Sequence, residues 1–372
     1  MGDDDVYYVC NSCGKKYSTD SFIFQCSCGG LLDLEDFQVN PSSILENEIN
    51  IFRYIKSMPF HENFNLWRNI TMGEGLTPIV PLSPDNPKVL VKVDYMMPTL
   101  SFKDRGAAVL IAKAKEIGVK KIVQDSSGNA GTSIAAYAAR AGIKCTIFVP
   151  EDTSPNKVKQ ISAYGAKVQK VKGTREDTAK ACLEAAQESN VFYASHVYNP
   201  FFYQGTKTYV YEIYEQLKGH MPEALFIPVG NGTLVLGAYY GLRDLLKSGL
   251  ISKMPRIIAI QSEKCPPIYE AFVKGKEDVD EVKNLGTLAE GIAIAYPKRG
   301  KQILEAIRDT GGEVITAPED NILPAKNYLA KLGFYVEPTS AATFAGYFHY
   351  IENKPIEDKV IIPLCGSGLK KP

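Results

Sequence analysis

The chain has 372 residues, of which 45% are hydrophobic and 23% are charged, and its 42 basic and 42 acidic side chains cancel. This composition is typical of a globular protein large enough for two domains, and the balanced charge gives no reason to expect a nucleic acid or an anionic membrane as partner. No apolar run approaches the roughly 20 residues of a membrane-spanning helix. Residues 1–5 are acidic and lack the basic and apolar parts of a secretory signal, so we expect a cytoplasmic protein.

Four of the eight cysteines lie close to the start, as a Cys-x2-Cys pair and a Cys-x-Cys pair with twelve residues between them. In a cytosolic chain such pairs indicate metal binding before disulfides, and a segment this short cannot fold on a core of its own. We predict a zinc-ribbon-like unit over residues 1–35 with a structural zinc ion, whose ligands are Cys10, Cys13, Cys26 and Cys28. Iron, or a ribbon without metal, remains an alternative. The segment has few Lys or Arg residues, which argues against RNA binding.

From residue 88 onward, apolar segments of strand length alternate with alanine-rich or charged segments of helical length. This alternation predicts mostly parallel sheets covered by helices on both faces, and the strands form two groups that suggest two sheets. The predicted strands are residues 88–93, 120–125, 144–149, 166–171, 190–194, 224–229, 256–260, 312–316 and 359–364. The predicted helices are residues 102–116, 131–141, 174–188, 203–217, 233–247, 298–309 and 319–331. In the stretch 36–75, aromatic residues suggest helical packing.

Lys103 lies in the segment Ser101-Phe102-Lys103-Asp104-Arg105-Gly106, at the start of a predicted helix. We predict that Ser101 is the N-cap and that Asp104 completes a capping box. The positive end of the helix dipole favours the uncharged form of a lysine in the first turn, which is the form that attacks an aldehyde. Lys103 is therefore the candidate to form a Schiff base with an aldehyde cofactor. The alternative is an ordinary surface lysine.

Two glycine-rich loops follow predicted strands, Ser126-Ser127-Gly128-Asn129-Ala130-Gly131 and Gly230-Asn231-Gly232-Thr233-Leu234. Each loop opens a helix, where backbone N–H groups can bind a carboxylate or a phosphate. A third loop begins at Cys365, and ligands of open α/β sheets bind beyond the carboxyl ends of strands. The second loop lacks the further glycine of a dinucleotide fingerprint, which disfavours an NAD oxidoreductase.

These motifs resemble those of the pyridoxal-phosphate enzymes of the tryptophan synthase β family, and Ser101 to Gly106 resembles the lysine segment of threonine synthases. The resemblance covers about residues 70–372. It includes Glu74-Gly75-x-Thr77-Pro78, and also Glu337-Pro338-Thr339-Ser340-Ala341-Ala342, where we expect Ser340 to cap a helix.

The resemblance implies an α/β fold of fold type II, with two doubly wound, mostly parallel-sheet domains beside the zinc-ribbon-like unit. It implies a large cofactor-binding domain of residues 36–103 and 206–372 and a small mobile domain of residues 104–205. By the habit of the family, we also expect a homodimer.

The resemblance also assigns roles to individual residues for pyridoxal 5'-phosphate as cofactor. Lys103 would be the catalytic lysine that attaches the cofactor, and Asn129 would bind its 3-hydroxyl oxygen. Cys365 would face the pyridine nitrogen. The residues that would hold the cofactor phosphate are Gly230, Asn231, Gly232, Thr233 and Leu234. The residues that would hold the substrate carboxylate are Ser127, Gly128, Ala130 and Gly131.

The implied activity on a small amino-acid substrate is that of threonine synthases, which convert O-phosphohomoserine and water to threonine and phosphate by γ-elimination and β-addition. Phe202 stands where the family has a phosphate-binding Arg, and Cys365 stands where Thr is usual. An Arg fork is a strong phosphate ligand, and Lys157, Lys207 or Ser195 would have to compensate.

Three alternatives remain open besides the disfavoured NAD oxidoreductase. Phe202 and Cys365 favour a serine/threonine dehydratase (an ammonia-lyase) built on the same machinery, and β-replacement on O-phosphoserine is a further enzyme alternative. From a different class, the chain could be a catalytically silent binding module. The four histidines show no ligand spacing, and we predict no catalytic role for them.

Overall fold

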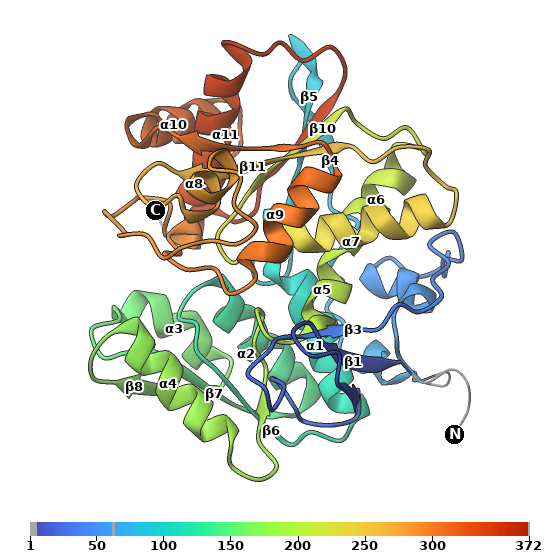
Figure 1. Ribbon diagram of the computed structural model, residues 1–372, viewed down its shortest axis with the longest axis vertical. Helices are drawn as coiled ribbons and strands as arrows, with labels where there is room; N and C mark the ends of the chain where they lie inside the picture. Colours follow the sequence, from blue (N-terminus) through green and yellow to red (C-terminus); the bar gives the residue numbers. More distant parts are fainter. Residues whose placement is uncertain (1–5, 62–63, 371–372) are drawn as a thin grey trace. The chain divides into compact units, whose positions relative to one another are not determined.

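The computed structural model describes residues 6–61 and 64–370, so the acidic start lies outside the described residues. The chain divides into two compact units (Figure 1). Unit 1 comprises Met1–Glu74 and Lys103–Gly205, and unit 2 comprises Gly75–Phe102 and Thr206–Pro372. The division into a large and a small mobile domain stays a prediction.

Unit 1 begins with a small antiparallel sheet in the order β2-β1-β3, formed by β1 (Tyr7–Cys10), β2 (Lys16–Ser18) and β3 (Leu32–Leu34). Two 3-10 helices follow, η1 (Ile51–Ser57) and η2 (Leu66–Asn69). The rings of Phe52 and Trp67 stack with their centroids 5.0 Å apart, and both side chains are buried. Aromatic residues of this stretch therefore pack against one another around two short helical turns, and the ring of Phe60 also meets that of Phe201 with the centroids 6.1 Å apart.

The larger part of unit 1 is a four-stranded parallel sheet in the order β8-β7-β6-β9. Its strands are β6 (Lys121–Gln124), β7 (Lys144–Pro150), β8 (Lys167–Val171) and β9 (Phe192–Tyr193). The helices of this part, in the green region of the ribbon in Figure 1, are α1 (Lys103–Glu116), α2 (Asn129–Ala141), α3 (Pro155–Ala163), α4 (Arg175–Ala186) and α5 (Pro200–Thr206). Since β6 and β9 are parallel neighbours, the loops after both strands lie at the same edge of the sheet.

Unit 2 contains a six-stranded sheet in the order β12-β11-β10-β13-β5-β4, in which only the pair of β4 with β5 is antiparallel. Its strands are β4 (Ile79–Ser83), β5 (Asn86–Lys92), β10 (Ala224–Pro228), β11 (Arg256–Ser262), β12 (Glu313–Ala317) and β13 (Val360–Pro363). Its α-helices are α6 (Thr208–Gln216), α7 (Thr233–Lys247), α8 (Pro267–Val273), α9 (Gly300–Asp309), α10 (Ile322–Lys331) and α11 (Pro338–Ile351). Short 3-10 turns are η3 (Asp94–Met96), η4 (Glu290–Ile292), η5 (Glu319–Asn321) and η6 (Gly368–Lys370).

The core of unit 2 lies between its sheet and α11. Val91, Phe226, Ile260 and Ile362 come from four different strands of the sheet and belong to one buried cluster with residues of α10 and α11. The ring of Phe226 meets that of Tyr347 on α11 edge to face, with the centroids 5.0 Å apart. The predicted site residues of unit 2 lie in the loops beyond the carboxyl ends of β10 and β13.

The α/β architecture with two mostly parallel sheets is confirmed, and each predicted strand is present within a few residues of its expected bounds. The predicted helix 203–217 is wrong in its continuity, because it is interrupted at Lys207 between α5 and α6. At Gly205 the chain passes so close to α1 that a Cβ there would lie 2.0 Å from the carbonyl oxygen of Arg105.

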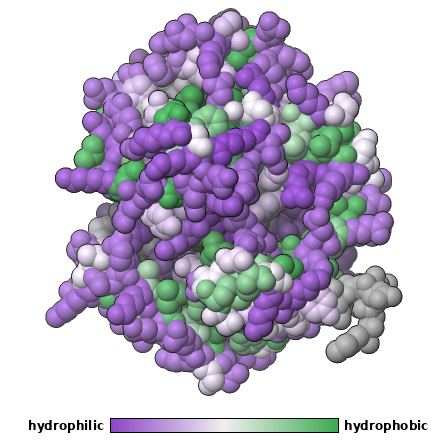
Figure 2. Space-filling model, viewed as in Figure 1, coloured by the Kyte–Doolittle hydropathy of each residue, from purple (hydrophilic) through white to green (hydrophobic). Residues whose placement is uncertain are grey.

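Within the part of the chain that the structure describes, no helix combines the length and apolar character needed to cross a membrane. Figure 2 shows a face covered mainly by hydrophilic residues, with smaller hydrophobic areas between them.

Candidate active site

Lys103 is the first residue of α1, and its side chain is partly exposed although the turn that carries it is buried. The carboxylate of Asp104 accepts a hydrogen bond from the hydroxyl of Ser133 on α2, at 2.5 Å. The ring of Phe202 covers Gly106, where a Cβ would lie 2.3 Å from a ring carbon. The first turn of α1 is thus fixed on two sides, which gives Lys103 a defined position.

The predicted capping box is wrong. Ser101 is buried, forms a bridge with Gly366, and its hydroxyl has no hydrogen-bond partner within the described residues. Since the helix begins at Lys103, Ser101 lies one residue too early to be the N-cap, and Asp104 binds α2 instead.

The predicted cap of α11 is wrong for a similar reason. Pro338 is the first residue of the helix, so Glu337 is the N-cap. Ser340 lies inside the first turn, where its hydroxyl accepts a hydrogen bond from the N–H of Gly366 at 3.3 Å.

The loop from Ser126 to Gly131 joins β6 to α2 and supplies the predicted carboxylate site. Asn129 is the first residue of α2, and its N-cap is Gly128, which offers no capping side chain. The hydroxyl of Ser126 accepts the N–H of Gly128 at 3.3 Å, which folds the loop back on itself. A Cβ at Gly131 would lie 1.7 Å from the carbonyl oxygen of Ser126, so only glycine permits this approach. The first turn of α2 therefore has no capping side chain at its N-terminus. The predicted carboxylate-binding residues lie at this helix start: Ser127, Gly128, Ala130 and Gly131.

In unit 2, the loop from Gly230 to Leu234 joins the fully buried β10 to α7. Gly232 is the N-cap of α7, with a φ of 76° that favours glycine, and a Cβ there would lie 2.3 Å from the side chain of Ile303. A Cβ at Gly230 would lie 2.8 Å from the carbonyl oxygen of Gly291. Asn231 lies between Gly230 and Gly232. The N-terminus of α7 has no capping side chain, so its backbone N–H groups can bind a phosphate.

Cys365 is buried directly beyond β13, and its carbonyl oxygen accepts the N–H of Phe102 at 2.9 Å. This bond fixes the residue that precedes Lys103 in the chain to the loop that carries Cys365. The donor set of an amine, two helix N-termini and a buried thiol fits an aldehyde cofactor with a phosphate group.

Glu74 has a buried carboxyl group that is hydrogen-bonded to α2. Its carboxyl oxygens accept hydrogen bonds from Tyr137 of α2 at 2.9 Å, from the Thr71 hydroxyl at 3.0 Å and from the N–H of Met72 at 2.8 Å. Burial raises the pKa of Glu74 to about 7, against the opposing effect of these bonds. We assign it a structural role under the loop that opens α2.

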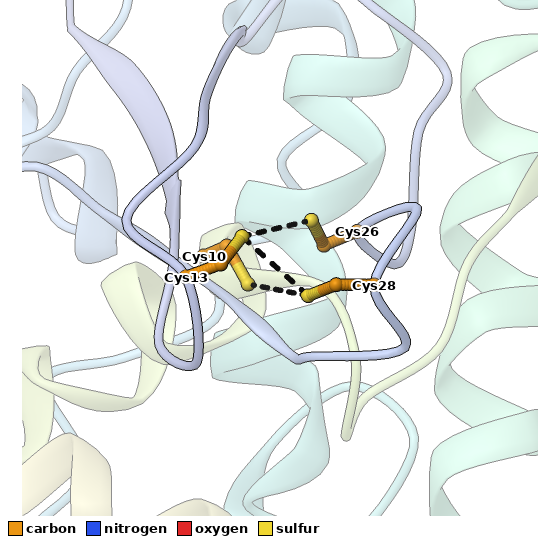
Figure 3. Close-up of side chains that lie close together, drawn as sticks. All are labelled: Cys10, Cys13, Cys26 and Cys28. Carbon is orange, nitrogen blue, oxygen red and sulfur yellow. Dashed lines mark hydrogen bonds between the residues drawn. The ribbon is translucent and has the colours of Figure 1, made fainter.

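The four cysteines of the predicted metal site converge at one end of the small sheet (Figure 3). The Sγ–Sγ distances are 3.5 Å from Cys10 to Cys28, 3.6 Å from Cys13 to Cys26 and 3.5 Å from Cys13 to Cys28. Zinc with four thiolates at about 2.3 Å needs sulfurs about 3.8 Å apart, so the quartet fits the ion. The N–H of Cys28 and the hydroxyl of Tyr17 lower the pKa of Cys26 to about 6, which favours the thiolate form that binds metals.

Phe202 is fully buried and belongs to the packing of α1. Two of the residues expected to compensate for the missing Arg are engaged elsewhere. The ammonium of Lys207 is buried and pairs with Asp244 at 3.0 Å, and the hydroxyl of Ser195 accepts the N–H groups of Val197 and Tyr198 at 3.3 Å. The side chain of Lys157 lies outside the described part of the structure.

His196 is a candidate functional residue for which no role was predicted from the sequence. It follows β9, at the same sheet edge as the loop after β6, and its Nδ1 lies 3.3 Å from Nε2 of Gln124. Burial lowers the pKa of His196 well below its usual value, and the positive charges of Lys103 and Arg175 lower it further. The sequence signal that could have identified His196 is its place as a polar side chain in the loop after the strand β9.

The sequence matches the family described as pyridoxal-phosphate dependent enzyme over residues 70–366. It is 34% identical to a threonine synthase of Methanocaldococcus jannaschii, over 98% of this chain and 92% of that protein. It is 32% identical to a threonine synthase of Methanosarcina acetivorans, over 99% of this chain and 93% of that protein.

Two solved structures share the fold. A serine racemase from Dictyostelium discoideum has a TM-score of 0.66 at 25% identity, over 78% of this chain and 92% of that chain. The processed form of threonine deaminase isoform 2 from Solanum lycopersicum has a TM-score of 0.68 at 23% identity, over 78% and 79% of the two chains. The second likeness supports the fold alone.

Proposed function

This chain belongs to the pyridoxal-phosphate-dependent enzymes, and from that premise we propose that it is a threonine synthase, a lyase that converts O-phosphohomoserine and water to threonine and phosphate. The observation that carries the proposal is the similarity to threonine synthases along almost the whole chain, the cysteine-bearing start included. The dehydratase and racemase likenesses cover less of the chain.

The resemblance assigns the cofactor contacts to individual residues. Lys103 would attach its aldehyde, Asn129 would bind its 3-hydroxyl oxygen, and Cys365 would face its ring nitrogen. The loop from Gly230 to Leu234 would hold its phosphate, a role supported by the tight glycine turn at the start of α7. When bound, the cofactor supplies an electron sink beside the substrate α carbon.

The protein's own residues would bind the substrate and move its protons. The backbone at the start of α2, from Ser127 to Gly131, would hold the substrate carboxylate. Nζ of Lys103 would take the proton from the substrate Cα, release it, and then take one from Cβ as phosphate leaves from Cγ. A proton would then be returned to Cγ and another to Cα, while water adds its hydroxyl at Cβ and its remaining proton goes to phosphate. The thiol of Cys365 would protonate the pyridine nitrogen of the cofactor less readily than a carboxylic acid would. The cofactor would therefore withdraw electrons from the substrate only moderately.

We expect phosphate and threonine from O-phosphohomoserine, and no 2-oxo acid from L-serine or L-threonine. The test is one set of assays with O-phosphohomoserine, L-serine, L-threonine and O-phosphoserine in separate wells, each scored for phosphate and for 2-oxo acid. Oxo acid from serine or threonine with O-phosphohomoserine inert would contradict the proposal and favour the dehydratase alternative.

We further propose that Cys10, Cys13, Cys26 and Cys28 bind one structural zinc ion. Replacing Cys13 with Ser is expected to abolish zinc binding and to make the small sheet sensitive to protease, because such a short segment depends on its metal for folding. Metal content by mass spectrometry and limited proteolysis are the measurements. Cys145→Ser is the matched control, since Cys145 lies on β7 outside the quartet and its replacement should leave the zinc content unchanged. Wild-type protein without zinc, or a Cys13→Ser variant with full zinc content, would contradict the assignment.

The resemblance also supports a cytoplasmic homodimer in which residues 104–205 form a small domain that closes over the substrate. Closure would exclude water from the reacting centre until it is needed.

A further inference from the structure

The hydrogen bonds around His196 define which of its ring nitrogens carries the proton. The N–H of Ser126 donates to Oε1 of Gln124 at 3.2 Å, so the amide of Gln124 presents its Nε2 group on the other side. That group lies 3.3 Å from Nδ1 of His196. An amide nitrogen can only donate, so Nδ1 is the acceptor and the neutral ring carries its proton on Nε2.

The ring of His196 is held in place on a second side. Phe202 meets it with the ring centroids 5.9 Å apart and an interplanar angle of 63°, and Phe202 is itself fixed against Gly106 of α1. Gln124 and Phe202 thus orient the imidazole, while no partner for its Nε2 is found within the described residues. His196 is partly exposed, so a solute can reach this oriented N–H donor.

The charges around His196 favour an anion. Lys103 of α1 and Arg175 at the start of α4 both act on the imidazole as positive charges, and both lower its pKa. The imidazole therefore stays neutral at neutral pH and offers Nε2–H as a donor. A phosphate beside it would meet this donor together with the positive charge of Arg175, since Lys103 is assigned to the cofactor.

We propose that His196 binds the phosphate group of the substrate through Nε2–H, in place of the arginine that is absent at position 202. The inference rests on the proposed function, because it assumes a phosphate-bearing amino acid as substrate. It explains how a chain with a buried phenylalanine at that position still recognises phosphate. Phe202 then orients the donor instead of supplying one.

Replacing His196 with Phe should weaken binding of inorganic phosphate and of O-phosphohomoserine about 10- to 100-fold, the effect of losing a hydrogen bond to a charged group. Gln at this position retains an N–H donor, so H196Q should stay within a few-fold of wild type. Binding of L-threonine, which lacks phosphate and is followed by the cofactor absorbance, should be unchanged in both variants. His220→Phe on the surface of unit 2 is the control and should bind phosphate normally.

A second measurement uses the wild-type holoenzyme. With only four histidines in the chain, the imidazole nitrogen resonances can be assigned, and those of His196 should shift on adding inorganic phosphate. Three results would each overturn the inference. They are unchanged phosphate binding by H196F, an equal loss of affinity for phosphate and for L-threonine, and a His196 resonance that does not shift on adding phosphate. Wild-type protein that binds phosphate through His196 but leaves O-phosphohomoserine inert would instead refute the proposed function alone.

Discussion

Lys103→Ala is expected to lower the rate of phosphate release from O-phosphohomoserine by about 10³-fold or more, because one amine is assigned both the attachment of the cofactor and the proton transfers. The position supports both roles, since Lys103 opens α1 and the residues after it are fixed by Ser133 and Phe202. Steady-state phosphate release measures the rate. The visible absorbance of the dialysed protein reports whether the cofactor remains attached.

The matched control is Lys115→Ala, on the same helix. Nζ of Lys115 donates to the carbonyl oxygen of Ala141 at 2.8 Å, a contact at the opposite end of α1 from Lys103. This variant should keep the wild-type rate and the wild-type absorbance. A Lys103→Ala protein with normal turnover would remove Lys103 from the mechanism. Wild-type protein without turnover or bound cofactor would instead favour the binding-module alternative.

The sheets were predictable from the sequence because their strands are buried on both faces. β10 and β13 consist entirely of buried residues, so each is a continuous apolar segment bounded by polar loops. β4 was not predicted, since it is an edge strand with Pro81 in its middle and a mixed burial pattern. The helix α3 was also missed, because it is polar and begins with Pro155.

The candidate site was predictable where the backbone determines it, and less so where side chains do. Gly131, Gly230 and Gly232 stand at positions where a Cβ does not fit, so the sequence must keep glycine there. The caps failed because a shift of one residue in a helix start changes which side chain is the cap. His196 was missed because its environment comes from β6, α1, α4 and α5, which only the tertiary structure brings together.

Lys92→Met is expected to lower the free energy of unfolding by about 3–5 kcal/mol, the usual cost of breaking a buried ion pair from one side. Lys92 ends β5 and Glu212 lies on α6, both side chains are fully buried, and Nζ lies 2.8 Å from the Glu212 carboxylate. Its other hydrogen bonds go to the carbonyl oxygen of Thr77 at 2.9 Å and to Oε1 of Gln216 at 3.0 Å. Removing the ammonium leaves the carboxylate of Glu212 buried without its countercharge. Denaturant unfolding followed by circular dichroism measures the change.

The double variant Lys92→Met/Glu212→Leu distinguishes two contributions to the free energy of unfolding. One is the cost of leaving a single charge buried, and the other is the net contribution of the intact ion pair. Replacing both charges by apolar groups of similar size is often nearly neutral, so the double variant should recover most of the stability that Lys92→Met loses. The exposed pair of Lys274 and Glu270 on α8, with the same separation of 2.8 Å, provides the control, and Lys274→Met should leave the unfolding midpoint unchanged. If the double variant were as unstable as the sum of the two single changes, the charges would act independently, and the contacts of Lys92 with Thr77 and Gln216 would be what fixes the end of β5.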